Sequence, residues 1–110
     1  MVSTAADVAR WACALFEGKV LSAASLSQML TFREVSVPPT PIVGYGLGAL
    51  RALFSGREYW GHGGNMIGYT AIMLYAPKER VSIAFLINQD YVDMAMGQPI
   101  LDAIVNAVRP

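Results

Sequence analysis

The stretch that decides the fold runs from Tyr59 to Asn88 and reads YWGHGGNMIGYTAIMLYAPKERVSIAFLIN. Between Gly68 and Ala76 the side chains alternate between two sets with the two-residue period of a β-strand. One set comprises Tyr69, Ala71, Met73 and Tyr75, and the other comprises Thr70, Ile72 and Leu74. Pro77 and the charged residues 78–80 are typical of a hairpin turn, and Val81–Asn88 is nearly continuous apolar, as in a strand covered on both faces. The stretch therefore predicts consecutive antiparallel strands.

Upstream of this stretch the two-residue period continues. Glu58–Gly61 is predicted to begin a strand, residues 55–56 a turn, and Tyr45–Phe54 an earlier strand that is weakened by its two glycines. Before them, Thr31–Val43 contains three prolines, which are compatible with neither a helix nor the interior of a sheet. This segment is predicted to be an extended loop and is the one plausible boundary between subregions.

The N-terminal part of the chain has a helical period instead. Thr4 and Asp7 resemble a capping box at the start of a helix, which Gly18 ends. Ser22 is predicted to cap a second, shorter helix, so that the two form a helical hairpin. The apolar positions with helical spacing are Val8, Trp11, Ala12, Leu15 and Phe16 in the first helix, and Leu26, Met29 and Leu30 in the second.

A last helix is predicted from about Pro99, which suits a first helical position, to Val108. Its apolar stripe comprises Ile100, Leu101, Ile104, Val105 and Val108. The order of elements indicates an α+β fold, with an antiparallel sheet of three to four strands, an N-terminal helical hairpin and a C-terminal helix packed on the sheet. Residues 1–110 are taken as one domain, with the hairpin in 1–31, the proline-rich loop in 32–44, and the sheet and last helix in 45–110.

The composition excludes several classes of function. Eight basic and eight acidic residues give no net charge and form no cluster that could neutralise phosphates, so a nucleic acid is not an expected partner. The single cysteine, Cys13, is interpreted as a small buried side chain. One cysteine and one histidine do not provide the three or four ligands of a zinc site, so no metal or other cofactor is expected.

The sequence also predicts where the chain acts. It starts without a basic segment followed by an apolar run, and its longest uncharged stretch is interrupted by glycines. We therefore expect no signal peptide and no membrane helix, and a cytoplasmic location by default.

The chain is unusually apolar for its length. It is 55% hydrophobic and 15% charged, whereas globular domains are about 45–50% apolar and about 25% charged. A domain of this size has little interior for so much apolar surface, so the surplus indicates an interface. The few charged side chains are interpreted as solvated surface residues.

The densest chemical signal is Gly61–Gly64, which surrounds the lone His62 with glycines. Composition alone favours a glycine-rich hairpin in which His62 is an incidental surface or packing residue. A phosphate-binding loop is excluded, because no Lys-Ser/Thr follows and the next element is a strand. Glycine at such a site permits close approach of another backbone or of a ligand.

Several segments carry a resemblance when they are taken in order. They are Ser3–Trp11, Leu21–Leu26, Tyr45–Gly48, His62-Gly63-Gly64, Gly68-Tyr69, Pro77 and Val81–Asn88. Together they resemble the C-terminal part of the serine β-lactamase, penicillin-binding protein and DD-peptidase superfamily, in its class C-like esterase and carboxypeptidase branch. The resemblance covers essentially the whole chain and implies a partial β-lactamase/transpeptidase-like fold.

The resemblance implies roles for four residues of the third catalytic motif. His62 would support a polar or anionic group of the substrate and the local proton network. Gly63 stands where many members have a hydroxyl, so that hydrogen bond is absent here. Gly64 would let the substrate lie against the strand, and the backbone N–H of Asn65 would be one half of an oxyanion hole.

The other catalytic motifs of the family are missing from these residues, so the catalytic set is incomplete. The nucleophile of the family is the serine of Ser-x-x-Lys, where the lysine can take the serine's proton. None of the serines has a lysine three residues on; they are Ser3, Ser22, Ser25, Ser27, Ser36, Ser55 and Ser82. The motif Tyr-x-Asn/Ser is also absent.

The main hypothesis is a non-catalytic, self-associating β-lactamase-like module of unknown role. One alternative is half of a split serine acyl hydrolase, in which a separate chain with the missing N-terminal part supplies the nucleophile. A ligand-binding module that uses the remnant cleft, or a fragment of a normal hydrolase, are further alternatives. Because the strand at 81–88 would lack its neighbour in the full fold, a homodimer or higher homo-oligomer is expected through this edge or the exposed sheet face.

Overall fold

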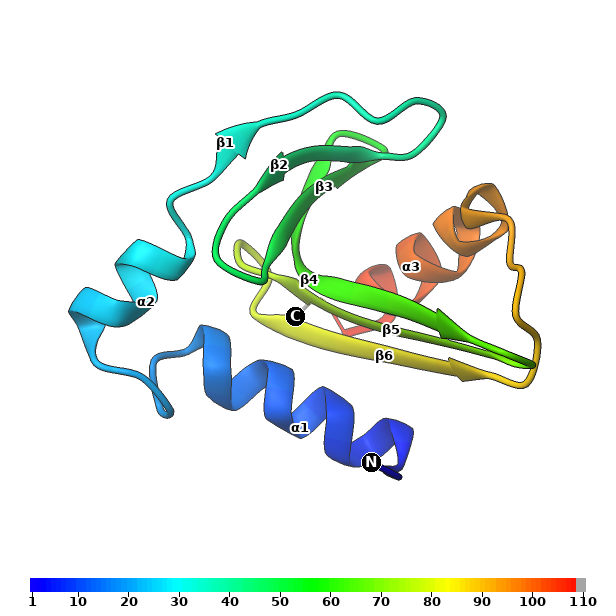
Figure 1. The fold of residues 1–110 in the computed structure, drawn as a ribbon, viewed down its shortest axis with the longest axis horizontal. Helices are drawn as coiled ribbons and strands as arrows, with labels where there is room; N and C mark the ends of the chain where they lie inside the picture. Colours follow the sequence, from blue (N-terminus) through cyan, green and yellow to red (C-terminus); the bar gives the residue numbers. More distant parts are fainter. Residues whose placement is uncertain (109–110) are drawn as a thin grey trace.

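The computed structural model describes residues 1–108, except for the side chains of residues 94 and 95 (Figure 1). The helices are α1 (Ala5–Phe16), α2 (Ala23–Met29) and α3 (Met94–Val108). The strands are β1 (Arg33–Glu34), β2 (Ile42–Tyr45), β3 (Leu50–Phe54), β4 (Arg57–Met66), β5 (Tyr69–Ala76) and β6 (Val81–Ile87). Among these helices, none has the length and apolar character needed to span a membrane.

The strands form one antiparallel sheet in the order β1-β2-β3-β4-β5-β6, so each strand pairs with its neighbours in sequence. The predicted α+β fold is confirmed, but the sheet has six strands rather than three to four. The additional pairing, Arg33 with Tyr45 and Glu34 with Gly44, lies partly within the predicted proline-rich loop. It is possible because the prolines are confined to residues 38–41, in the connection between β1 and β2.

The predicted strand Tyr45–Phe54 is two strands joined by a turn. Gly48 has a φ of 71°, a left-handed conformation that glycine adopts without strain. At Gly46 a side chain would lie less than 3.0 Å from the carbonyl oxygen of Met29, because the turn packs closely against the end of α2. The two glycines therefore form the turn of a hairpin and do not weaken a continuous strand.

The prediction that the last helix begins at Pro99 is wrong, since α3 begins at Met94 and contains Pro99 in its interior. An interior proline removes one main-chain hydrogen bond, a cost that tertiary packing can offset. The packing here comes from Leu101 and Val105, which are almost completely buried, whereas Ile100 and Val108 at the edge of the predicted stripe are half exposed.

Each face of the sheet carries its own apolar cluster and its own helix, and Figure 1 shows α1 and α3 on opposite sides of β5 and β6. The α3 face buries Ala52, Phe54, Tyr59, Leu74, Ala76, Ile83, Leu101 and Val105. The α1 face buries Ala12, Phe16, Ala49 and Tyr75. The alternation predicted for β5 is confirmed, because Leu74 and Tyr75 belong to different clusters.

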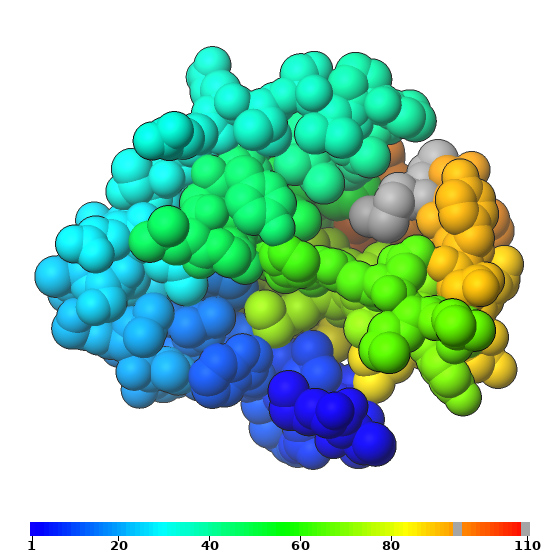
Figure 2. All heavy atoms as spheres, in the orientation of Figure 1, coloured from blue at the N-terminus to red at the C-terminus, as the bar shows by residue number. Residues whose placement is uncertain are grey.

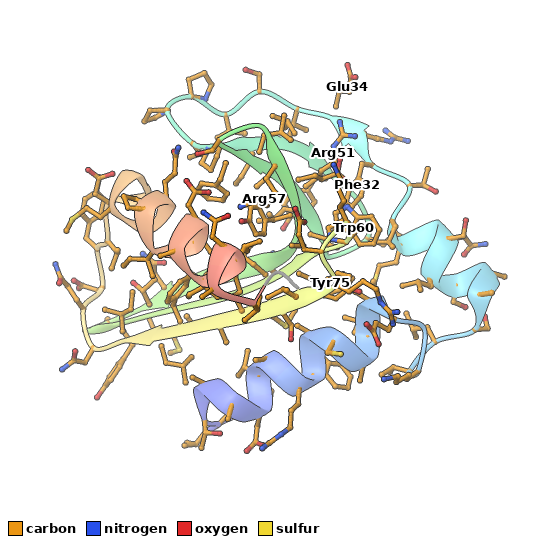
Figure 3. The ribbon with its side chains drawn as sticks, turned by 180° about the vertical axis from the view of Figure 1, so that it is seen from behind. Phe32, Glu34, Arg51, Arg57, Trp60 and Tyr75 are labelled. Atoms are coloured by element: carbon orange, nitrogen blue, oxygen red, sulfur yellow. The ribbon has the colours of Figure 1, made fainter. Side chains whose placement is uncertain are left out.

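Aromatic rings hold α1 against the sheet. Phe16 of α1 stacks on Tyr75 with a centroid distance of 5.6 Å and contacts the edge of Trp60 at 6.1 Å. Phe32 lies 6.2 Å from Trp60, and Figure 3 shows Phe32, Trp60 and Tyr75 close together. Trp11, which was predicted for the apolar stripe of the helix, is half exposed instead.

The interpretation of every charge as solvated is wrong for Arg57, whose side chain is only 16% exposed. Its Nε donates to Oε1 of Glu79 at 3.0 Å, and its Nη1 donates to Oδ1 of Asp102 at 3.3 Å. Asp102 also accepts a hydrogen bond from the Ser55 hydroxyl. These contacts join the β3–β4 turn, the β5–β6 turn and α3.

A second set of polar contacts connects the C-terminal end of α1 to the sheet. The carboxylate of Glu17, which caps α1, accepts from Arg80 Nη2 at 3.0 Å and from the Tyr75 hydroxyl at 3.3 Å, and it pairs with Lys19 at 3.2 Å. The hydrogen bonds from Arg80 and then Lys19 hold the pKa of the Glu17 carboxyl below its ordinary value. Burial raises the pKa of the Tyr75 hydroxyl.

Glu17 should therefore make folding stability depend on pH. Because its folded-state pKa is lowered, its contribution is present above the ordinary value of 4.5 and is lost as pH falls through the lowered pKa. Glu17→Gln should lower the free energy of unfolding at neutral pH and flatten its decline in acid, as measured by urea unfolding at a series of pH values. Glu34→Gln, which changes an exposed carboxylate on β1, should do neither; an equal effect of both variants would contradict the role of Glu17.

Two glycines of β4 meet different surroundings. A side chain at Gly61 would lie less than 3.0 Å from the carbonyl oxygen of Met73 on β5, where only a shift of the backbone could relieve the clash. At Gly64 a side chain would meet no atom within 4 Å. Gly61 is thus required for the β4–β5 pairing, whereas Gly64 faces open space.

This difference predicts opposite results for two matched substitutions. Gly61→Ala should destabilise the fold by about 1–3 kcal/mol, the usual cost of overpacking a well-packed site. Gly64→Ala should change stability by no more than about 0.5 kcal/mol, as for other open surface positions. Urea unfolding of both variants measures the difference, and equal stabilities would show that the Met73 contact does not constrain β4.

Candidate functional site

The predicted third-motif residues all lie on the part of β4 that extends beyond its neighbour β3. The β3–β4 pairing ends where Leu50 faces Gly61, whereas the β4–β5 pairing continues to Met66. Residues 62–66 therefore have a paired strand on one side only. The structure brings His62, Gly63, Gly64 and Asn65 together on this half-open segment.

His62 is held by a residue from β2. The hydroxyl of Tyr45 lies 2.5 Å from Nε2 of His62, and the two rings meet edge to face with centroids 6.0 Å apart. Both side chains are exposed. Figure 2 shows the face of the molecule on which the β2–β3 hairpin and the tip of the β4–β5 hairpin both reach the surface.

The side chain of Asn65 is hydrogen-bonded to the segment that follows β6. Its Nδ2 donates to the carbonyl oxygen of Asp90 at 2.6 Å, and the Thr70 hydroxyl donates to the carbonyl oxygen of Gln89 at 2.7 Å. Residues 89–90 are thus held against the end of the β4–β5 ladder. The side-chain amide of Asn65 therefore already has a hydrogen-bond partner within the protein.

A cavity of about 260 Å³ lies beside the half-open segment. His62, Gly63, Gly64 and Asn65 line one side of it, and Leu50, Phe54 and Ile72 contribute apolar walls. A second cavity, of about 230 Å³, lies between α3 and the sheet and shares Phe54 and Ile72 with the first. The apolar walls of this cavity belong to the α3-face cluster, whereas His62 is paired with Met73, which packs on the α1-face cluster. The imidazole and the apolar space therefore lie on opposite faces of β4.

Within residues 1–108 no serine hydroxyl is hydrogen-bonded to a lysine or to His62. Ser55 is hydrogen-bonded to Asp102 and Gln98 of α3. Lys19 pairs with Glu17.

No group of three or more His, Cys, Asp or Glu side chains in the described part of the chain is arranged to hold a metal ion. Cys13 is free and only partly buried.

Sequence reasoning did not identify Tyr45 as the partner of His62. The available signal was the Tyr45–Gly48 segment, whose glycines mark a hairpin that returns the chain toward β4. Sequence reasoning also missed that Glu79 and Arg80 connect the sheet to the helices.

Comparison with known proteins identifies the family. The Beta-lactamase family model matches residues 1–106. D-aminopeptidases from strains of Cereibacter sphaeroides are 30% identical over 83 residues, which is 72% of this chain but 16% of theirs. The chain thus spans a small part of the length of these curated relatives.

Solved structures agree with this assignment. The D-amino acid amidase from Ochrobactrum anthropi SV3, complexed with D-phenylalanine, superposes with a TM-score of 0.79 at 26% identity, covering 96% of this chain and 36% of the amidase. A D-stereospecific amidohydrolase from Streptomyces sp. gives a TM-score of 0.72 at 32% identity over 84% of this chain and 28% of that chain. A penicillin-binding protein from Bacillus halodurans shares the fold at 19% identity, with a TM-score of 0.68 over 96% of this chain and 31% of its own.

The resemblance inferred from the sequence is therefore confirmed by the family match and by the amidase and penicillin-binding protein structures. The six-stranded antiparallel sheet between α1 and α3 fits this assignment. The chain belongs to the beta-lactamase family.

Proposed function

We propose that these 110 residues are non-catalytic on their own and form the substrate-side wall of an acyl-hydrolase site of the D-aminopeptidase and D-amino acid amidase kind. The nucleophilic serine and its lysine would lie outside these residues, on the same polypeptide or on another. The supporting observation is the half-open end of β4, which carries the exposed side chain of His62, while no serine hydroxyl within residues 1–108 is hydrogen-bonded to a lysine or to His62.

In this proposal each residue of the site has its own role in binding the ligand. The exposed imidazole of His62 would hydrogen-bond a polar group of the ligand, and the backbone N–H of Asn65 would stabilise a developing oxyanion because it is fixed before the charge appears. The open space at Gly64 would admit the ligand to the strand. The amidase relative was solved in complex with D-phenylalanine, so a D-amino acid is the ligand that we expect at this segment.

The first test separates binding from catalysis. The purified chain should not release ammonia from D-phenylalanine amide, and it should not hydrolyse a chromogenic ester or cephalosporin. D-Phenylalanine should nevertheless shift the amide NMR signals of residues 62–65, because the proposed ligand-binding segment is present even though the nucleophile is not. His62→Ala should abolish these shifts.

Met66→Ala is the matched control, since Met66 is an exposed residue at the other end of the same segment. It should retain the response to D-phenylalanine. Robust turnover that His62→Ala abolishes, or covalent labelling of the chain by a penicillin, would contradict the non-catalytic proposal. If D-phenylalanine shifted none of the amide NMR signals of residues 62–65, the proposal that this segment binds the ligand would be contradicted.

Self-association through β6 is a second proposed property, supported by the edge position of this strand. Within residues 1–108, β6 pairs only with β5, and none of its residues is charged. Leu86 on this strand is 44% exposed. Edge strands usually carry charges that prevent pairing with another chain, so this uncharged edge fits a two-fold dimer.

Leu86→Lys should convert the dimer to a monomer, because lysine on an edge strand opposes edge-to-edge pairing. Leu53→Lys is a matched control: Leu53 is 43% exposed but lies on β3, which has a strand on both sides. Sedimentation or light scattering measures the mass of both variants. A monodisperse wild-type monomer at micromolar concentration would overturn this proposal.

A further inference from the structure

The pair formed by Tyr45 and His62 spans the end of β3. Tyr45 faces Leu50 across the β2–β3 ladder, and Leu50 faces Gly61 across the β3–β4 ladder. His62 is the next residue along β4 and lies beyond the last β3–β4 pair, so Tyr45 reaches it from the second strand away.

Both residues have backbones that are fixed by an adjacent glycine. Gly46, which follows Tyr45, packs against the carbonyl of Met29, and its N–H donates to the carbonyl oxygen of Ala49 at 2.7 Å. Gly61, which precedes His62, packs against the carbonyl of Met73. The distance of 2.5 Å between the Tyr45 hydroxyl and Nε2 of His62 thus joins two anchored strands.

The chemistry of the two groups determines which one donates. A phenol hydroxyl is a much stronger acid than the N–H of a neutral imidazole, and an imidazole nitrogen without a proton is a good acceptor. The favourable arrangement is therefore O–H of Tyr45 donating to Nε2 of His62. The hydrogen bond at one ring nitrogen determines the tautomer of a histidine, so the proton of the neutral ring must then be on Nδ1.

We propose that Tyr45 is a positioning residue that holds neutral His62 in the Nδ1–H tautomer through the hydrogen bond to Nε2. Among the side chains that the structure describes, none is hydrogen-bonded to Nδ1 of His62. Nδ1–H is then the donor that His62 offers to a ligand. If the proposed function holds, the ligand group that it meets has an acceptor oxygen, as an amide carbonyl or a carboxylate does.

The proposal can be tested directly because His62 is the single histidine of the chain. Two-bond ¹⁵N–¹H correlation spectra of the ¹⁵N-labelled protein distinguish a protonated from an unprotonated ring nitrogen. They should be recorded at a pH at which the titration of the same signals shows the ring to be neutral. The wild-type spectrum should show Nδ1 protonated and Nε2 unprotonated, and Tyr45→Phe should return the ring to the Nε2–H form that free histidine favours.

Tyr69→Phe removes the hydroxyl of another exposed tyrosine, on β5, and should leave the wild-type tautomer unchanged. An Nε2–H tautomer in the wild type would overturn the proposal, and this measurement needs no variant to fold. Persistence of Nδ1–H in a folded Tyr45→Phe would also overturn it, because Tyr45 would not then be the cause. These outcomes do not depend on ligand binding or hydrolysis, so they are distinguishable from a failure of the proposed function.

Discussion

The close approach of Gly61 to the carbonyl of Met73 is the constraint on which the site depends. It allows β4 to remain paired with β5 after β3 has ended, so that His62 and the three residues after it emerge on an ordered strand with one open side. Gly64, in the same motif, has the opposite surroundings, since nothing occupies the space beside it. Two glycines three residues apart can thus have different roles, Gly61 in strand packing and Gly64 in access to the strand.

The parts of the fold that the sequence predicts well are those with a local signal. The alternation in β5 and the charged turn after it predicted the last hairpin, and Thr4 and Ser22 predicted the helix starts that the structure has. The pairing of β1 with β2 was missed because the prolines obscured two short strands. Pro99 misled the prediction of α3, because a proline tolerated inside a well-packed helix resembles one at its start.

The resemblance implied that Gly64 lies on a strand, and β4 contains it together with His62, Gly63 and Asn65. The partner of His62 was not predictable in the same way. Tyr45 reaches His62 only because β3 ends at Leu50, and the end of a strand is determined by its register with both neighbours rather than by its own residues. A side-chain contact of this kind requires the assembled sheet.

Two of the few charged residues lie in one turn, and each forms an ion pair with another part of the fold. Glu79 and Arg80 are adjacent in the β5–β6 turn, yet Glu79 pairs with Arg57 beside α3 and Arg80 pairs with Glu17 at the end of α1. The turn therefore connects to the helices on both faces of the sheet. In a chain with a small core, such contacts orient the layers where apolar packing alone is non-directional.

The sequential order of the strands has a consequence for how the chain folds. Every ladder joins segments that are close in sequence, so closing each hairpin costs little loop entropy and the contact order of the sheet is low. During synthesis each strand can pair with the one made just before it, without waiting for a distant segment to emerge. The strands can therefore pair in the order of synthesis, whereas α1, which packs on β5 and β6, and α3 can cover the two faces of the sheet only after those strands have formed.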